Sequence, residues 1–400
     1  MNILRKYDLT LLKVAVCLVF FVTPLESIGI SDESSPFSIV KLVALFLFMI
    51  WGFTSRKCEK NQIIRIFLLL GGYWLFSSLW ALNPSVSFSR VLNFYIPSLF
   101  TIMIVGYEIK RDSDLRNVLL SYLFGCIVLA INCHISRAEI LANAKFSDME
   151  RVTTFGQDQN ELSFLLIMGL VIALHGVQTY IDKRVRLIFL LSAILFVYAI
   201  LLTGSRTGAI MIFSVVVLFI WNNKKYTTFL LPIFILGFPI VIAQIPESSI
   251  ERILETKESL STGDVSSRGD IWNKAFRAFT HENQLLGVGY LNFPEMMKHY
   301  YGSVKASHNT YISYLINGGV IGLFFLLVIL LKLYKYCSFL VKKTKNSYWF
   351  AYIFPLMIAM LTLETQHRRW MFLIAIVLYK AYFILKHDTT FEPTLTKDEK

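Results

Sequence analysis

Arg206 is the first residue whose position suggests chemistry, because it stands where two long apolar stretches, 186–202 and 206–222, meet. Ser205 or Thr203 is available to cap a helix that begins there. A helix N-terminus has free N–H groups and a partial positive charge, so an arginine at that end favours binding of an anion. The alternative is an arginine whose charged end reaches the membrane surface from an apolar helix.

Arg268 repeats this arrangement in the segment "SRGDIWNKAFRAF". Apolar residues recur there at helical spacing, and Ser267 with Asp270 matches a capping box, so we predict an amphipathic helix that starts at Arg268 and lies along the membrane surface. A cation in the first turn opposes the helix dipole, which suggests an anion beside it. The alternative is a solvated surface charge. The helix face is formed by Ile271, Trp272, Ala275, Phe276 and Phe279.

His308 precedes an apolar stretch at 309–331 and is followed by Asn309. Histidine titrates near neutral pH, which suits a general base. The alternative is a capping or interfacial residue. His299 is close in sequence, but the segment offers no further ligands, so we expect no metal site.

Four further polar residues precede apolar stretches in the same way. Arg151 and Asn160 come before 161–179, where Asn160 is alternatively the helix N-cap, and Arg368 with Arg369 comes before the last stretch. Nearby acidic residues, Glu161 among them, are expected to pair with arginines. Because these segments converge on one membrane face, we predict a polyanionic ligand there, such as a diphosphate.

Composition identifies an all-α polytopic membrane protein. The chain has 400 residues, of which 55% are hydrophobic and only 16% charged, and a mean hydropathy of +0.57. Soluble domains are about a quarter charged, and a bilayer-spanning helix needs about 20 apolar residues. The sequence predicts about twelve spans, at 9–26, 36–53, 64–81, 91–107, 117–134, 161–179, 186–202, 206–222, 227–244, 309–331, 349–364 and 369–386.

Basic residues in alternate loops place both termini in the cytoplasm. The net charge of +12 is therefore mainly a topology signal whose partner is the lipid bilayer, and no nucleic-acid partner is expected. None of the five cysteines falls in the large outer loop, so no disulfide framework is expected. The predicted organisation is spans one to nine in 1–244, a large periplasmic loop with short helices in 245–308, spans ten to twelve in 309–386, and a tail in 387–400.

Three blocks in this order, "LLTGSRTGAI", "SSRGDIWNKAFRAFTHENQLLGVGYLNF" and "SHNTYISYLINGGVIGLFF", resemble the O-antigen ligase / O-antigen polymerase family of bacterial inner membranes. The earlier "RVTTFGQDQNELSFLLIMGL" is also similar to that family's segment before its central spans. The resemblance implies transfer of a glycan from undecaprenyl diphosphate at the periplasmic face, to a lipid A core sugar in a ligase or to a second lipid-linked glycan in a polymerase.

The resemblance also implies residue roles. Arg206 and Arg268 would bind the diphosphate, Arg151 is a further candidate contact, and His308 would be catalytic. Ser205, Asn160, Asn309, Arg368 and Arg369 would support the site. Neutralising the leaving diphosphate with arginines and deprotonating the acceptor with His308 gives a transfer that needs neither metal nor cofactor.

Two alternatives stay open. Polymerase and ligase share these motifs, although the compact chain with one large late loop favours a ligase. A secondary transporter is the remote alternative. The sequence disfavours it because ionisable residues near the membrane centre are scarce and the largest loop is late and outer.

Overall fold

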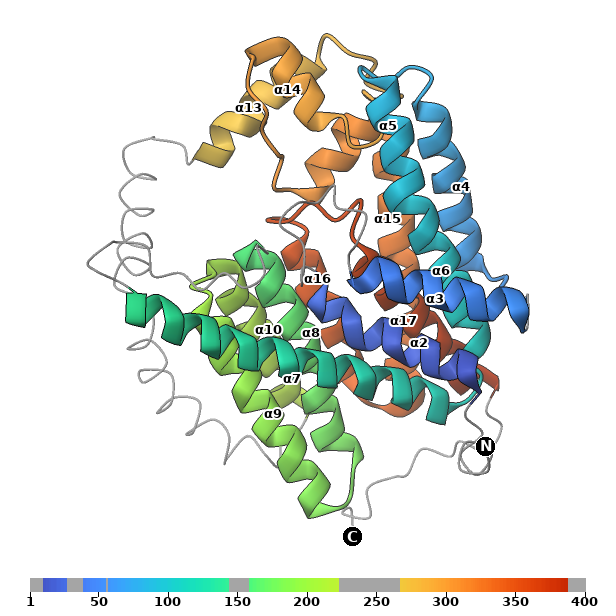
Figure 1. Ribbon diagram of the computed structural model, residues 1–400, viewed down its shortest axis with the longest axis vertical. Coiled ribbons are helices and arrows are strands. Elements are labelled where there is room, and N and C mark those ends of the chain that lie inside the picture. The colour runs from blue at the N-terminus through green and yellow to red at the C-terminus, as the bar shows by residue number, and fades with distance from the viewer. Residues whose placement is uncertain (1–9, 27–38, 55–56, 144–157, 223–266, 388–400) are drawn as a thin grey trace.

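The computed structural model describes residues 10–26, 39–54, 57–143, 158–222 and 267–387, and these form helices and loops with no strand (Figure 1). The elements are α2 Leu11–Val22, η1 Thr23–Leu25, α3 Ile39–Phe53, α4 Gln62–Ser77, α5 Pro84–Arg90, η2 Val91–Tyr95, α6 Ile96–Glu108, α7 Asp112–Asn143, α8 Gln159–Thr179, α9 Lys183–Leu202, α10 Arg206–Asn222, α13 Ser267–Phe279, α14 Phe293–Tyr301, α15 Thr310–Thr344, η3 Ser347–Tyr352, α16 Phe354–Ala359 and α17 Arg369–His387.

Among the described residues, six helices are long and apolar enough to cross a membrane, which confirms the all-α membrane class. Five other apolar helices are shorter, so the count of twelve spans stays a prediction. The predicted span at 227–244 and the tail at 388–400 lie outside the described residues. The six are Pro84–Glu108, Asp112–Ser136, Gln159–Thr179, Lys183–Leu202, Thr310–Thr344 and Arg369–His387.

One predicted span is wrong in its extent. The stretch 349–364 is not one helix, because a 3₁₀ segment ends at Tyr352 and α16 covers only Phe354–Ala359. Pro355 lies in the first turn of α16, where its missing N–H is tolerated, but it prevents a continuous helix through η3. The helix α7 continues to Asn143, whereas its candidate membrane span ends at Ser136, close to the predicted end at 134.

The helix α15 is kinked at Gly319, whose φ of 61° and ψ of −162° are not helical. A Cβ at Gly319 would lie 2.2 Å from the carbonyl oxygen of Leu285, so only glycine fits this close approach. The backbone carbonyls of Ile316 and Asn317 instead accept from Val288 and Gly289 at 3.0 and 2.9 Å. The kink therefore joins the first part of α15 to the loop between α13 and α14.

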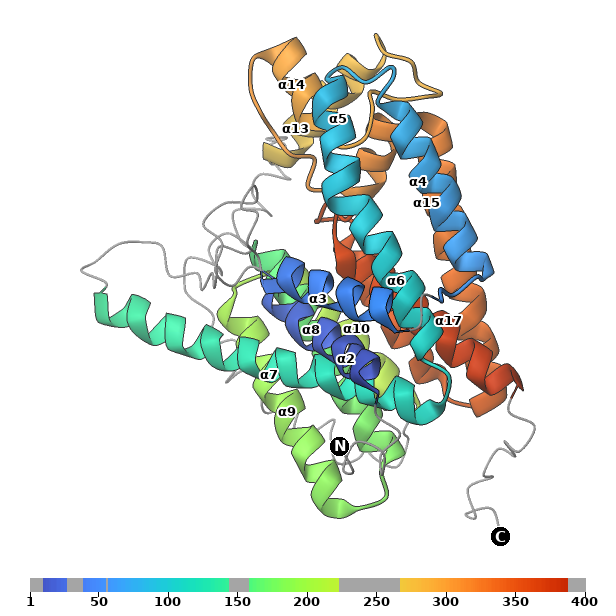
Figure 2. The ribbon, with the colours of Figure 1, turned by 45° about the vertical axis from the view of Figure 1, so that its right-hand side comes forward.

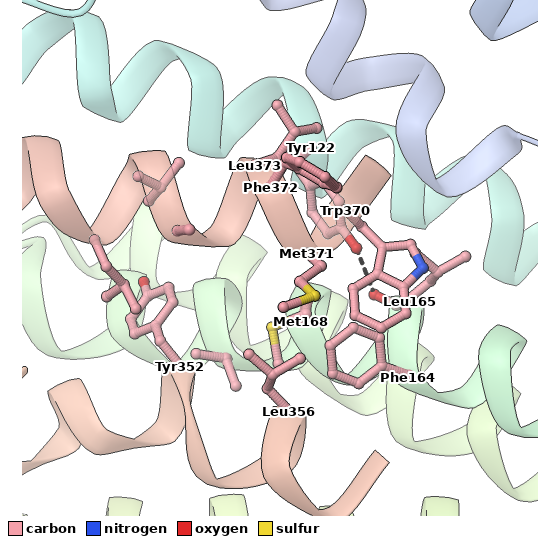
Figure 3. Packing of buried hydrophobic residues seen from close by; sticks show 14 of the residues in the cluster. Tyr122, Phe164, Leu165, Met168, Tyr352, Leu356, Trp370, Met371, Phe372 and Leu373 are labelled. Atoms are coloured by element: carbon pink, nitrogen blue, oxygen red, sulfur yellow. Dashed lines mark hydrogen bonds between the residues drawn. The ribbon is translucent and has the colours of Figure 1, made fainter. Parts of the chain in front are cut away.

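The core is centred on α8, which is buried along nearly its whole length, as its uniformly apolar sequence requires. Phe164 of α8 packs on Trp370 of α17 with ring centroids 4.3 Å apart, and the Tyr122 hydroxyl of α7 donates to the carbonyl oxygen of Leu165 at 3.1 Å (Figure 3). Because α7 and α17 both pack on α8, the N-terminal end of α8 has a fixed place in the molecule.

The helices α13 and α14 lie together at one end of the molecule, beside the start of α15 (Figures 1 and 2). The prediction of a helix here is confirmed, and part of its apolar face packs on protein; its position along the membrane surface stays a prediction. Ala275 and Phe279 join a cluster with Phe293 of α14 and Ile316 of α15. Phe276, predicted on the same face, is 41% exposed. Packing on α15 thus fixes the position of α13 and of Arg268 in its first turn.

Candidate active site

The first turn of α8 is capped by Asp158, whose carboxylate accepts from the backbone N–H groups of Asn160 and Glu161 at 2.8 and 3.3 Å. Asn160 is therefore not the N-cap, and that alternative is wrong. The cap falls two residues earlier because Asp158 has the extended backbone that an N-cap needs.

Asn160 instead reaches the turn that carries Arg206. The Ser205 hydroxyl donates to the Asn160 side-chain oxygen at 2.7 Å and accepts from the Gly208 N–H at 3.0 Å. Ser205 thus caps α10, as predicted, and at the same time fastens the start of α10 to the first turn of α8. Arg206 is exposed as the first residue of α10.

His308 is half-buried and has a φ of 47°, in the left-handed region that a bulky residue rarely adopts. Both neighbours are tied down: the carbonyl oxygen of Ser307 accepts from the Trp272 indole at 2.8 Å, and the Asn309 side chain caps α15 by accepting from Ile312 at 3.1 Å. Strain held by surrounding contacts is typical of functional positions.

Two charged residues act on the His308 imidazole. Burial lowers the pKa of His308 below its ordinary value of 6.5, the positive charge of Arg268 lowers it further, and the negative charge of Asp158 partly opposes them. The lowered pKa keeps the imidazole neutral at pH 7, which is the form that accepts a proton.

This electrostatic arrangement predicts that Asp158→Asn moves the acid limb of the pH–activity profile to lower pH. The asparagine side chain still caps α8, but loss of the negative charge removes the effect that raises the pKa of His308. Activity that needs neutral His308 would then persist to lower pH. The rate of glycan transfer measured across pH checks this. Asp270→Asn is the matched control, since Asp270 pairs with Lys274 at 2.7 Å; an equal shift in both variants would contradict the prediction.

The two arginines before α17 have different partners. Arg368 pairs with Glu161 at 3.0 Å, which confirms the expected role of Glu161 as an arginine partner. Arg369 instead lies 3.8 Å from Glu26 and lines a small cavity between α2, α3 and α6. The pKa of neighbouring His367 is well below its ordinary value, because the side chain is buried near Arg368 and Arg90. Of the two arginines, Arg368 is the one whose ion pair reaches the first turn of α8.

Three of the predicted segments therefore meet at one place. Asn160 binds Ser205 beside Arg206, Glu161 binds Arg368, and the loop before Arg368 binds Thr310 near His308. Arg151 lies outside the described residues. We did not predict the part played by Asp158, although the pattern Asp-x-x-Glu before an apolar stretch is a cap signature that would have indicated the helix start.

The fold and this geometry define a class of protein. It is a helical membrane protein whose candidate site has arginines and a histidine at or beside helix N-termini. Residues 187–327 match the family model described as O-Antigen ligase. This match covers about a third of the chain; it supports an O-antigen ligase family protein and confirms the resemblance found in the motifs. The matched segment includes Arg206, Arg268 and His308. No curated protein matches the chain.

The family match supports a glycosyltransferase-like activity of the ligase or polymerase type, with lipid-linked glycans as substrates. Together with the apolar helices, it also indicates an integral membrane protein.

Proposed function

We propose that this protein is an O-antigen ligase that moves a glycan from undecaprenyl diphosphate to a sugar hydroxyl of the lipid A core at the periplasmic face of the inner membrane. The observation that carries the proposal is the meeting of polar segments at the first turn of α8. Asn160 binds Ser205 beside Arg206, and Glu161 binds Arg368, whose loop is hydrogen-bonded to Thr310 near His308.

The diphosphate of the donor would be held by Arg206 and Arg268, with Arg151 as a further contact. Arg206 opens α10 and Arg268 lies in the first turn of α13, so each cation stands at a helix end that already attracts anions. A guanidinium donates paired hydrogen bonds to phosphate oxygens, and its charge stabilises the negative charge that grows on the leaving diphosphate.

His308 would act as the general base. Its neutral imidazole accepts the proton of the acceptor hydroxyl while the hydroxyl oxygen forms a bond to the anomeric carbon of the donor glycan. The bond from that carbon to the diphosphate oxygen breaks at the same time, and its electron pair leaves with undecaprenyl diphosphate. Asn309 supports this arrangement by capping α15, which follows His308, and Ser205 by capping α10, which begins at Arg206.

Transfer in vitro tests the proposal. The purified protein in lipid vesicles is given a defined undecaprenyl-diphosphate glycan with either lipid A core or a second portion of the same donor as acceptor. The expected result is glycan attached to lipid A core. Lengthened lipid-linked glycan without attachment would identify a polymerase, and no product with either acceptor would contradict the transferase proposal.

A further inference from the structure

Glu161 is a buried carboxylate with both oxygens engaged by one short segment. The side chain is only 5% exposed, Oε2 lies 3.0 Å from the Arg368 guanidinium, and Oε1 accepts from the Trp370 indole at 3.3 Å. A buried charge that loses its partner is strongly destabilised. Glu161 therefore ties the segment that precedes α17 to the first turn of α8, where the helix dipole also favours a negative charge.

The loop 360–368, which ends at Arg368, also holds the backbone next to His308. Thr310 N–H donates to the Met360 carbonyl oxygen at 2.8 Å, and the Thr310 hydroxyl donates to the Leu363 carbonyl oxygen at 2.6 Å. The Thr365 N–H donates to the Thr310 hydroxyl at 3.2 Å. The start of α15 and the loop 360–368 are thus one hydrogen-bonded unit.

His308 depends on that unit for its conformation. Its φ of 47° is uncommon for a residue other than glycine, so contacts of the residues on either side are needed to hold it. On the C-terminal side these are Asn309 and Thr310, and both bind the loop 360–368. Loosening this loop from α8 would therefore release the backbone that holds His308.

We propose that Glu161 is a positioning residue: by binding Arg368 it fixes the loop 360–368 against α8 and so sets the place of His308 relative to the turn that carries Arg206. Asn160, the residue before it, binds Ser205. Two consecutive residues of α8 thus set the spacing between the base and one of the diphosphate-binding arginines. The inference rests on the proposed function for its effect on catalysis, but not for its effect on the structure.

The first test compares Glu161→Gln with Glu59→Gln. Glu59 forms a similar pair with Lys380 of α17, 3.2 Å apart, which involves no residue of the site. We expect Glu161→Gln to speed hydrogen–deuterium exchange in the peptides containing Thr310 and Thr365, and Glu59→Gln to leave it unchanged. Unchanged exchange in Glu161→Gln, or equal acceleration in both variants, would overturn the proposal. If Glu161→Gln does not fold, Arg368→Gln makes the same test. The Arg368 side chain is 25% exposed, so its replacement disturbs the core less.

The second test is kinetic. Glu161→Gln and Arg368→Gln should each lower kcat by roughly 10- to 100-fold, the effect of a displaced catalytic group, with donor KM within about twofold of wild type. The double variant should be no slower than either single variant, since both break one contact, and Arg368→Lys should recover much of the rate. A raised donor KM with unchanged kcat in Arg368→Gln would mean that Arg368 binds the donor directly and would overturn the proposal. If the wild-type protein transfers no glycan, the proposed function fails. The exchange experiment still tests whether Glu161 positions the loop 360–368.

Discussion

His308→Asn should lower the rate of glycan transfer by about 10²- to 10⁴-fold, the usual contribution of a general base. Asparagine is the informative replacement because it tolerates the left-handed backbone that His308 adopts, with its φ of 47°. The variant thus removes the imidazole without forcing the start of α15 to move. The measurement is kcat for transfer from the undecaprenyl-diphosphate glycan, and donor KM should change little.

His299→Ala serves as the matched control for that experiment. His299 is an exposed histidine of α14, in the same part of the chain, and its ring contacts Tyr300. We expect it to retain wild-type activity. Transfer at a normal rate by His308→Asn would rule out His308 as the base, and equal losses in both variants would indicate a general effect on this part of the molecule.

The helices could be predicted from the sequence because hydropathy over about 20 residues is a local property. The start of α10 followed from Ser205, since capping is also local. At the start of α15 the cap is Asn309 and not His308, the residue for which a capping role was considered. The break in 349–364 and the kink at Gly319 could not be predicted in this way. The kink depends on a loop about 30 residues earlier, whose Leu285 carbonyl leaves no room for a side chain at Gly319.

The candidate site was predicted in its residue types but not in its organisation. The polar segments were expected at one membrane face, yet nothing local in the sequence indicates that the start of α8 is their common contact. Arg368 and Arg369 illustrate the difficulty. They are adjacent in sequence, but one binds Glu161 at the site while the other turns toward Glu26, and only long-range packing decides between these directions.

Arg206→Ala and Arg268→Ala should each reduce transfer by about 10²- to 10³-fold, the effect of removing one group that stabilises charge in the transition state. Both arginines are proposed to contact the diphosphate, whose negative charge grows as its bond to the glycan breaks. Replacement by lysine should recover part of the rate, because lysine keeps the charge but cannot donate paired hydrogen bonds. The measurement is kcat/KM for the donor, with membrane expression checked for each variant.

Arg277→Ala is the matched control on the same helix as Arg268, because Arg277 is exposed near the opposite end of α13. It should leave kcat/KM unchanged. Arg268→Ala has a second expected effect: without the positive charge that lowers it, the pKa of His308 rises, so the acid limb of the remaining activity moves toward neutral pH. That shift is opposite to the one expected for Asp158→Asn. A large loss of rate with no shift would separate the two roles of Arg268 and keep only the diphosphate contact, whereas near-normal transfer would contradict the assignment of Arg268 to the donor.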